Sequence, residues 1–376
     1  MKLIKSLVAT AAAVLVSGAA WADITIGASL PLTGPASNLG ISMKNAMALF
    51  PKEIAGQKVN LVILDDATDP TNGVKNARRF VTEDKVDVIL GSAATPVGIA
   101  MADVALESKT PQLLATPAPT PKDAFSFRMP QSVGVMAYAI VEHMKKQGVK
   151  TVGFLGYTDA YGESWLKDFT PIAEKAGIKV VVAERFARTD TSVTAQALKV
   201  TAANPDAVLV VASGSGAAMP QMGIAERGYK GKIYQTHAGA TKDLMRVGGK
   251  TVEGTYVVSG PVIAPDQLSA SHPSKKAAQD FVAAYDKVYG AGSHNQFSGH
   301  SWDMATVMQK AVPIALKSAK PGTPEFRLAL RDAFETMGRT VVAHGVLNWT
   351  KTDHWGYTNE TGVMVKVVNG DWKVEQ

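Results

Sequence analysis

The chain has 376 residues, which exceeds one ordinary domain and is enough for two. Hydrophobic residues make up 46% of it and aromatic residues only 7%, a composition typical of an α/β protein with a large aliphatic core. The formal charge is +6, but basic and acidic residues are interleaved and form no basic block, which argues against nucleic acid as a partner. Cysteine is absent, which excludes disulfide bonds and lipid attachment at a cysteine.

The first 22 residues have the three parts of a secretory signal peptide. Lys2 and Lys5 precede an apolar run from Leu7 to Val16, and Ala20-Trp21-Ala22 forms a small-x-small cleavage site. The run is short for a bilayer span, so a cleaved signal is favoured over the alternative, a membrane anchor. We expect a soluble protein that begins at Asp23 and acts in a bacterial periplasm without a lipid anchor.

From residue 23 to about residue 260 the sequence alternates between strand-like and helix-like segments. β-branched runs of about five residues end at Gly, Pro, Ser or Thr, as buried parallel strands do. These runs lie in DITIGASL, KVNLVILDD, VDVILGS, PQLLA, KTVGFLG, IKVVVAERF, PDAVLVV and GKIYQ. Helical patterns at residues 71–84, 132–148, 162–177 and 194–205 separate many of them. The alternation predicts doubly wound α/β sheets.

After about residue 261 the pattern changes to helices in succession, at residues 274–290, 299–322 and 323–338. Short strand-like pieces, HGVLNW, GVMVKVVNG and DWKVEQ, end the chain. This tail has no parallel sheet of its own, so we expect its helices and strands to add onto the two earlier units. More than one crossing between those units is then required, which implies a hinge.

Small hydroxyl and glycine residues gather at the expected carboxyl ends of the strands, where open α/β sheets bind their ligands. Backbone N–H groups of the helices that follow carry partial positive charge and suit an anion such as a carboxylate. Each hydroxyl could equally be a helix cap, but three such strand ends in one chain favour a binding site. The residues are Ser92 and Thr95, Thr116 and Thr120, and Ser213, Gly214 and Ser215.

Five segments in a characteristic order carry a resemblance to a known family. They are IGASLPLTGPASNLG, LDDATDPTNGVKNARRFVTED, VDVILGSAATP, LLATPAPT and DAYGESW. With them, most of the mature chain resembles the periplasmic substrate-binding proteins of ABC importers, in the branched-chain amino-acid (Leu/Ile/Val-binding) family. The resemblance implies a type I periplasmic binding fold with two Rossmann-like lobes, a three-segment hinge and a ligand trapped by closure. We place the lobes at residues 23–142 plus 262–345 and 143–261 plus 346–376.

The resemblance also implies ligand contacts where this sequence matches the family. Thr95 stands where a hydroxyl holds the ligand carboxylate, and Ala118 and Thr120 stand where a backbone group and a hydroxyl follow the fourth strand. Tyr161 of DAYGE lines the second lobe. Leu39 occupies a first-loop position where the family often has an aromatic residue, so the pocket wall is expected to differ there.

His237, in IYQTHAGATKDL, is the largest departure from the amino-acid binders. Those proteins have a carboxylate at this position that pairs with the ligand's α-ammonium, and losing such a partner costs on the order of several kcal/mol. An imidazole can donate a hydrogen bond or carry positive charge, so it suits a keto, hydroxyl or second carboxylate oxygen better. The alternative is a structural imidazole that bonds a neighbouring carbonyl.

Motifs for catalysis and metal binding fail in this sequence. Gly214 begins a G-x-G-x-x-M segment that lacks the third glycine and the downstream acid of a dinucleotide fingerprint. Ala212 stands where a G-x-S-x-G nucleophile elbow needs glycine. His300 and Asp303 are spaced i, i+3, but two residues do not make a metal site. We therefore expect no enzyme activity, no cofactor and no metal.

These observations predict a receptor that captures a small carboxylate and delivers it, as a monomer, to an ABC permease at the inner membrane. The segments IYQTH, PGTPEFR and DAYGE resemble the branch of the family associated with aromatic carboxylates and aromatic 2-oxo acids. A branched-chain or other hydrophobic amino acid is the alternative ligand. A sensor lobe that presents its ligand to a membrane receptor is the alternative role.

Overall fold

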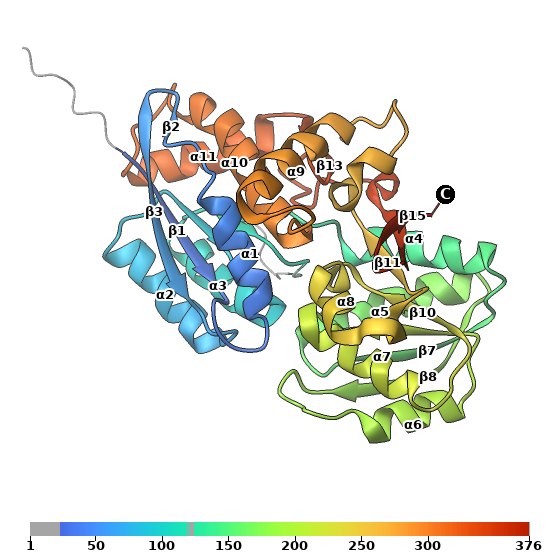
Figure 1. Ribbon diagram of the computed structural model, residues 1–376. Coiled ribbons are helices and arrows are strands. Elements are labelled where there is room, and N and C mark those ends of the chain that lie inside the picture. Colours follow the sequence, from blue (N-terminus) through green and yellow to red (C-terminus); the bar gives the residue numbers. More distant parts are fainter. Residues whose placement is uncertain (1–22, 118, 120–123, 376) are drawn as a thin grey trace, which may run out of the picture.

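The computed structural model describes residues 23–117, 119 and 124–375. The predicted signal peptide, Ala118 and Thr120 lie outside these residues. Two lobes, each a sheet flanked by helices, stand side by side, and the chain passes between them more than once (Figure 1). This arrangement confirms the predicted doubly wound α/β architecture.

The first lobe contains a six-stranded sheet in the order β2-β3-β1-β4-β5-β6, parallel except for β2. Helices cover both of its faces, which explains why its central strands are continuous apolar runs. The strands are β1 (Ile24–Leu30), β2 (Glu53–Ile54), β3 (Gln57–Asp65), β4 (Val88–Gly91), β5 (Gln112–Leu114) and β6 (Ser126–Arg128). Helices α2 (Pro70–Thr82) and α3 (Thr95–Glu107) pack together, as do α1 (Ser37–Met47), α10 (Gln296–Ala315) and α11 (Pro324–Thr336).

The second lobe contains a seven-stranded sheet in the order β15-β14-β11-β10-β9-β7-β8, with β14 and β15 antiparallel at one edge. The tail of the chain thus adds to an existing sheet. The strands are β7 (Thr151–Tyr157), β8 (Lys179–Phe186), β9 (Ala207–Val211), β10 (Lys232–Gln235), β11 (Tyr256–Ser259), β14 (Val363–Val368) and β15 (Asp371–Val374). The α-helices are α4 (Val133–Lys146), α5 (Ala160–Lys175), α6 (Thr194–Ala202), α7 (Ala218–Ala225) and α8 (Lys242–Gly248).

Within residues 124–375 the chain crosses between the lobes three times, and two of the crossings lie away from the expected positions. The crossing expected near residue 142 falls within α4, which packs against α5, β11 and β14, so the chain changes lobe before this helix. The crossing expected near residue 262 follows β11 directly. The crossing expected near residue 345 comes later, because His354 still stacks on Phe127 of the first lobe with ring centroids 4.0 Å apart.

Buried polar side chains tie the crossing segments together. Gln131, just before α4, donates from Nε2 to the carbonyl oxygens of His344 and Thr361, both at 3.3 Å. His344 lies in the turn between β12 (Thr340–Val342) and β13 (Gly345–Leu347). The Asp303 carboxylate on α10 accepts the His344 backbone N–H at 3.1 Å and contacts its ring Nδ1 at 2.7 Å. The first and third crossings therefore share one hydrogen-bonded centre.

The aromatic packing around Phe127 generates the first prediction. Phe127 on β6 is fully buried, and its ring centroid lies 4.0–5.2 Å from those of His354, Trp349 and Phe334. We expect Phe127→Ala to lower the free energy of unfolding by about 3–5 kcal/mol, through lost burial and a residual cavity. Urea denaturation measures the change. Val341→Ala, at a site 47% exposed, is the control and should stay within about 0.5 kcal/mol; equal losses would contradict the packing role.

Candidate ligand-binding site

A narrow cavity of about 10 Å³ lies between the lobes. Most of its lining residues come directly after the carboxyl end of a strand, as expected for open α/β sheets. The first lobe and its connected helix α10 contribute Leu39, Ala93, Thr95, Ala115, Thr116, Pro117 and Phe297, and the second lobe contributes Tyr161, Arg188, Ser213, His237 and Ala238.

The structure brings most of the predicted site residues to this cavity. Leu39, Thr95, Tyr161, Ser213 and His237 all line it. Their part in ligand binding stays a prediction, as do the roles of Ala118 and Thr120, which lie outside the described residues.

Gly214 lies next to the cavity rather than in its lining. It begins the short 3-10 helix η1 (Gly214–Ala217) directly after Ser213, and its φ of +54° is one that L side chains rarely adopt. A Cβ at this position would collide with the side chain of Asn38, which reaches over from the first lobe. Gly214 thus permits the close approach of the two lobes.

Two hydroxyl groups meet at the first-lobe wall. Thr95 begins α3, and its Oγ1 is hydrogen-bonded to Oγ1 of Thr116, which follows β5; both residues are buried. One hydroxyl proton lies between the two oxygens, so the other hydroxyl can donate to a ligand. The N-terminus of α3 adds partial positive charge at the same point. This wall is suited to a carboxylate.

His237 is buried on the second-lobe wall, in the short 3-10 helix η2 (His237–Gly239) that follows β10. Its ring centroid lies 5.9–6.4 Å from the rings of Tyr161, Trp165 and Phe297. Burial, with a smaller contribution from nearby His344, lowers the pKa of His237 to about 3. The imidazole is therefore neutral at physiological pH. Its Nδ1 is buried without a hydrogen-bond partner among the described residues.

Tyr161 is held in place by the start of α5. Asp159 caps this helix and accepts hydrogen bonds from the backbone N–H groups of Tyr161 at 2.9 Å and Gly162 at 3.3 Å. The Tyr161 hydroxyl bonds Oγ1 of Thr236 at 2.7 Å. Burial raises the pKa of this phenol above its ordinary value, so Tyr161 remains a neutral hydrogen-bonding group.

Arg188 is a lining residue that the sequence analysis missed. It follows β8, forms an ion pair through Nε with Asp159, and donates from Nη1 to Oγ of Ser213 at 2.9 Å. Its guanidinium carbon lies 4.1 Å from the centre of the Tyr157 ring. The signal was present in the segment AERFARTD, where an arginine follows a strand end, but the strand-end rule was applied only to hydroxyl and glycine residues.

Two threonines in ATPAPT, Thr116 and Thr120, were expected at this strand end. Thr116 lies against Thr95, whereas Thr120 lies outside the described part of the chain. Both threonines stand near the same strand end, so spacing alone does not distinguish them. The choice depends on the path of the loop after β5.

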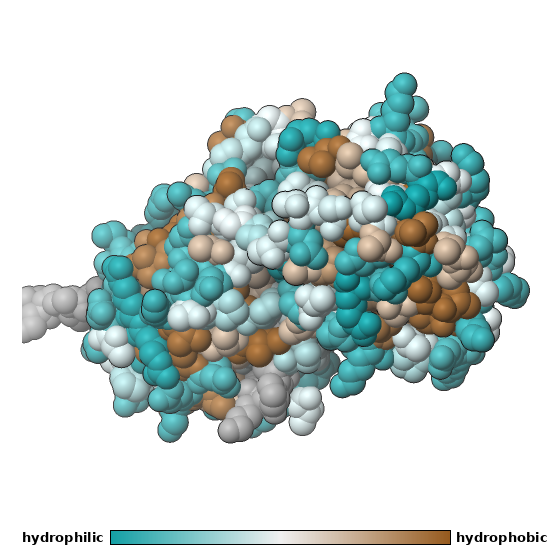
Figure 2. Space-filling view, turned by 90° about the horizontal axis from the view of Figure 1, so that it is seen from below, coloured by the Kyte–Doolittle hydropathy of each residue, from teal (hydrophilic) through white to brown (hydrophobic). Residues whose placement is uncertain are grey.

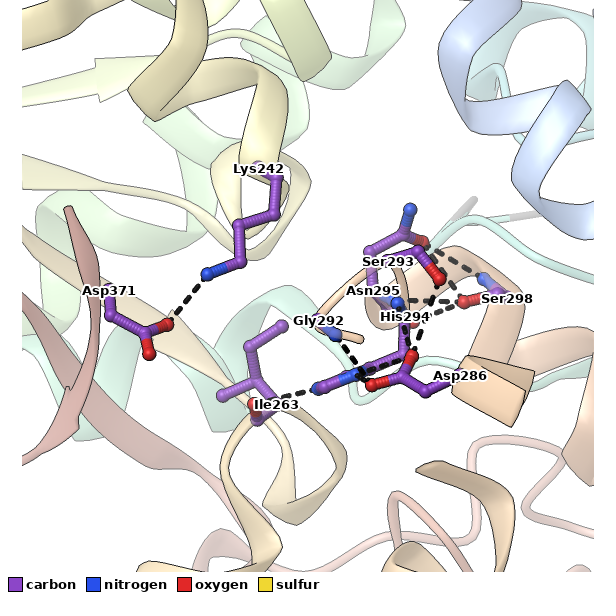
Figure 3. A network of polar contacts seen from close by, with 9 residues as sticks. All are labelled: Lys242, Ile263, Asp286, Gly292, Ser293, His294, Asn295, Ser298 and Asp371. Carbon is purple, nitrogen blue, oxygen red and sulfur yellow. Dashed lines mark hydrogen bonds and ion pairs between the residues drawn. The ribbon is translucent and has the colours of Figure 1, made fainter. Parts of the chain in front are cut away.

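The two lobes touch at the rim of the cavity. Asn38 of α1 donates from Nδ2 to Oδ2 of Asp243 of α8 at 2.9 Å. Figure 3 shows polar networks on either side of this boundary. Lys242 of α8 pairs with Asp371 of β15 at 2.7 Å, while Asp286 accepts the backbone N–H of Gly292 and organises the loop that leads into α10. The rim of each lobe is therefore held by its own polar contacts.

The described residues hold no group of three or more histidine, aspartate or glutamate side chains that could bind a metal ion. His300 stacks on His344 with ring centroids 4.0 Å apart, and Asp303 bonds His344. Within the same part of the chain, no helix combines the length and the apolar character that crossing a membrane requires.

The fold and the interlobe site define a two-lobed binding protein, and comparison with known proteins agrees. Residues 23–371 match the periplasmic binding protein family, and the chain belongs to it. The Leu/Ile/Val-binding protein homolog 3 of Brucella melitensis is 28% identical over 343 residues, which cover 85% of this chain and 90% of that protein.

Solved structures extend the likeness. An extracellular ligand-binding receptor from Rhodopseudomonas palustris is 47% identical, with a TM-score of 0.93 over 95% of this chain and all of that one. An ABC transporter solute-binding protein of R. palustris, solved in complex with benzoate, shares the fold at 18% identity, with a TM-score of 0.78 over 94% of this chain and 95% of that one. These findings confirm the predicted family and the type I periplasmic binding fold.

Because His237 is buried in its neutral form, we expect it to make the free energy of unfolding depend on pH. Below about pH 6.5 the imidazole binds a proton in the unfolded chain but stays neutral in the folded chain, so its stabilising contribution is present above pH 6.5 and lost as the pH falls toward 3. Between about pH 5.5 and 4, the slope of the free energy of unfolding against pH should be smaller in His237→Gln than in wild type, by about 1.4 kcal/mol per pH unit. Urea denaturation across this range measures the slopes.

The slopes of wild type and variant must be compared with each other, because other buried groups titrate in the same pH range. Burial raises the pKa of Asp66 and of Asp87 to about 6, so their contributions change in the opposite direction and are common to wild type and variant. His272→Gln, at a less buried histidine whose pKa is also lowered, should flatten the slope less. Parallel curves for wild type and His237→Gln would show that His237 is protonated in the folded chain.

Proposed function

We propose that this protein is the periplasmic receptor of an ABC importer, which captures a small carboxylate between its lobes and delivers it to an inner-membrane permease. The observation that supports this proposal most directly is the chemistry of the cavity. A hydroxyl pair at a helix N-terminus faces a neutral imidazole and a guanidinium, and the described lining residues include no carboxylate. Export by residues 1–22 and action as a monomer without a cofactor belong to the same proposal.

The ligand we propose is an aromatic acid or an aromatic 2-oxo acid. An amino acid would bring a buried ammonium, which needs an anionic partner and costs several kcal/mol without one, on the order of 3–5. Asp159 is the acid that contacts the lining residue Arg188, and it already pairs with that arginine and caps α5. The rings of Tyr161 and Phe297 offer contact surface for an aromatic ligand. The benzoate complex of the R. palustris protein supports this ligand class.

A hydrophobic amino acid is the second candidate. The names of the curated relatives favour it, since they are Leu/Ile/Val-binding proteins and their homologues. Leu39 also offers an aliphatic surface in the cavity. A catalytic role is not proposed, because Ser213 is bonded to Arg188 rather than to a general base.

Calorimetric titration of the purified protein with phenylpyruvate, benzoate, phenylalanine and leucine tests this proposal. We expect the amine-free acids to bind with Kd on the order of 0.1–10 μM, about −7 to −9.5 kcal/mol, and leucine not to bind. The physical reason is the neutral His237 where an ammonium would need an acid. Micromolar binding of leucine, without binding of either amine-free acid, would contradict the proposal and favour the second candidate.

Substitution of the hydroxyl pair tests where the carboxylate lies. Thr95→Val and Thr116→Val should each weaken binding of the acid by roughly 1.5–3 kcal/mol, the usual cost of a hydrogen bond to a charged group. Thr336→Val is the matched control, because this exposed threonine bonds only the carbonyl of Asp332 within its own helix, at 2.7 Å. Unchanged affinity in both cavity variants would show that the ligand carboxylate does not lie at this wall.

A further inference from the structure

We propose that Arg188 recognises a second oxygen group of the ligand, separate from the carboxylate held by Thr95 and Thr116. This inference rests on the proposed function and narrows the ligand class. The preferred ligand is an acid that also carries a hydroxyl, oxo or second carboxyl substituent in reach of Arg188, rather than an unsubstituted aromatic acid.

Arg188 is positioned by its surroundings before any ligand binds. Its Nε pairs with Asp159, whose other oxygen caps α5, so one carboxylate orients both the arginine and the helix that carries Tyr161. The guanidinium lies over the Tyr157 ring at 4.1 Å and within 5.8 Å of the Tyr161 ring. The side chain is only 12% exposed. A planar group held in this way presents its donors in a set direction.

Arg188 and Ser213 place hydrogen-bond donors at this wall of the cavity. Arg188 has donors only, and its Nη1 uses one of them on Oγ of Ser213 at 2.9 Å. Because the Ser213 oxygen accepts that bond, the hydroxyl proton of Ser213 points elsewhere and can serve another acceptor. Both residues line the cavity. A guanidinium and a hydroxyl that both donate make a site for an acceptor oxygen.

The donor site formed by Arg188 and Ser213 lies apart from the carboxylate site. Thr95 and Thr116 belong to the first lobe, whereas Arg188 and Ser213 follow β8 and β9 of the second lobe. A ligand in the cavity meets both walls. An apolar substituent against Arg188 would leave its donors without acceptors in a desolvated place, which is unfavourable. An oxygen substituent there satisfies them.

Matched ligand pairs test the inference. Benzoate is titrated beside the three hydroxybenzoates and the three benzenedicarboxylates, into wild type, Arg188→Gln and Arg185→Gln. We expect at least one substituted acid to bind wild type about 10- to 100-fold more tightly than benzoate, the range of a charged hydrogen bond. Arg188→Gln should abolish that gain, so that no substituted acid binds this variant more tightly than benzoate does. Arg185→Gln removes the same charge from an arginine 38% exposed that pairs with Glu163 outside the cavity, and should keep the gain.

The outcomes separate this inference from the proposed function. Wild type that binds benzoate but gains nothing from any substituent overturns the inference alone, and so does an Arg188→Gln variant that loses affinity equally for benzoate and the substituted acids. Absence of binding for every acid overturns both. If Arg188→Gln does not fold, Arg188→Lys replaces it: the point charge without the planar fork should reduce the gain at least several-fold, and an undiminished gain overturns the inference.

Discussion

The direction of the parallel strands is the constraint on which this molecule depends. In each sheet the carboxyl ends lie at one edge, and the three crossings hold the two edges opposite one another. Side chains from strand ends that are far apart in the sequence, such as Thr95 and His237, therefore line one cavity. The N-termini of α3 and α5 also lie at this cavity, since Thr95 and Tyr161 line it, and the partial positive charge of a helix N-terminus suits an anion.

The proposed function requires the crossings to let the lobes move. Gln131, His344 and Asp303 join the segments by hydrogen bonds that are directional but few. Contact between the lobes at the cavity rim is slight by comparison, with Asn38 bonding Asp243 and Gly214 allowing the close approach. A ligand that contacts both walls supplies the differential affinity that favours closure.

The sequence was sufficient where local pattern determines structure. Apolar runs that end at small residues predicted the sheets, and the strand-end rule pointed to Thr95, Thr116 and Ser213, which line the cavity. His237, which also lines it, was predicted from the family resemblance. The sequence was insufficient where packing determines the place of a helix or a side chain in the fold. The helix Val133–Lys146 has no feature that assigns it to one lobe, and its contacts with α5, β11 and β14 place it in the second. Arg188 is a cavity residue because Asp159 and Tyr157 orient it, which depends on how the ends of β7 and β8 lie against each other.

The central claim is that the ligand bridges two lobes that close around it. Small-angle X-ray scattering tests this most directly, with the protein measured alone and with a saturating acid whose binding calorimetry has established. The account predicts a smaller radius of gyration with the ligand, because closure brings the two sheet edges together. Superimposable scattering curves for a ligand known to be bound would contradict it.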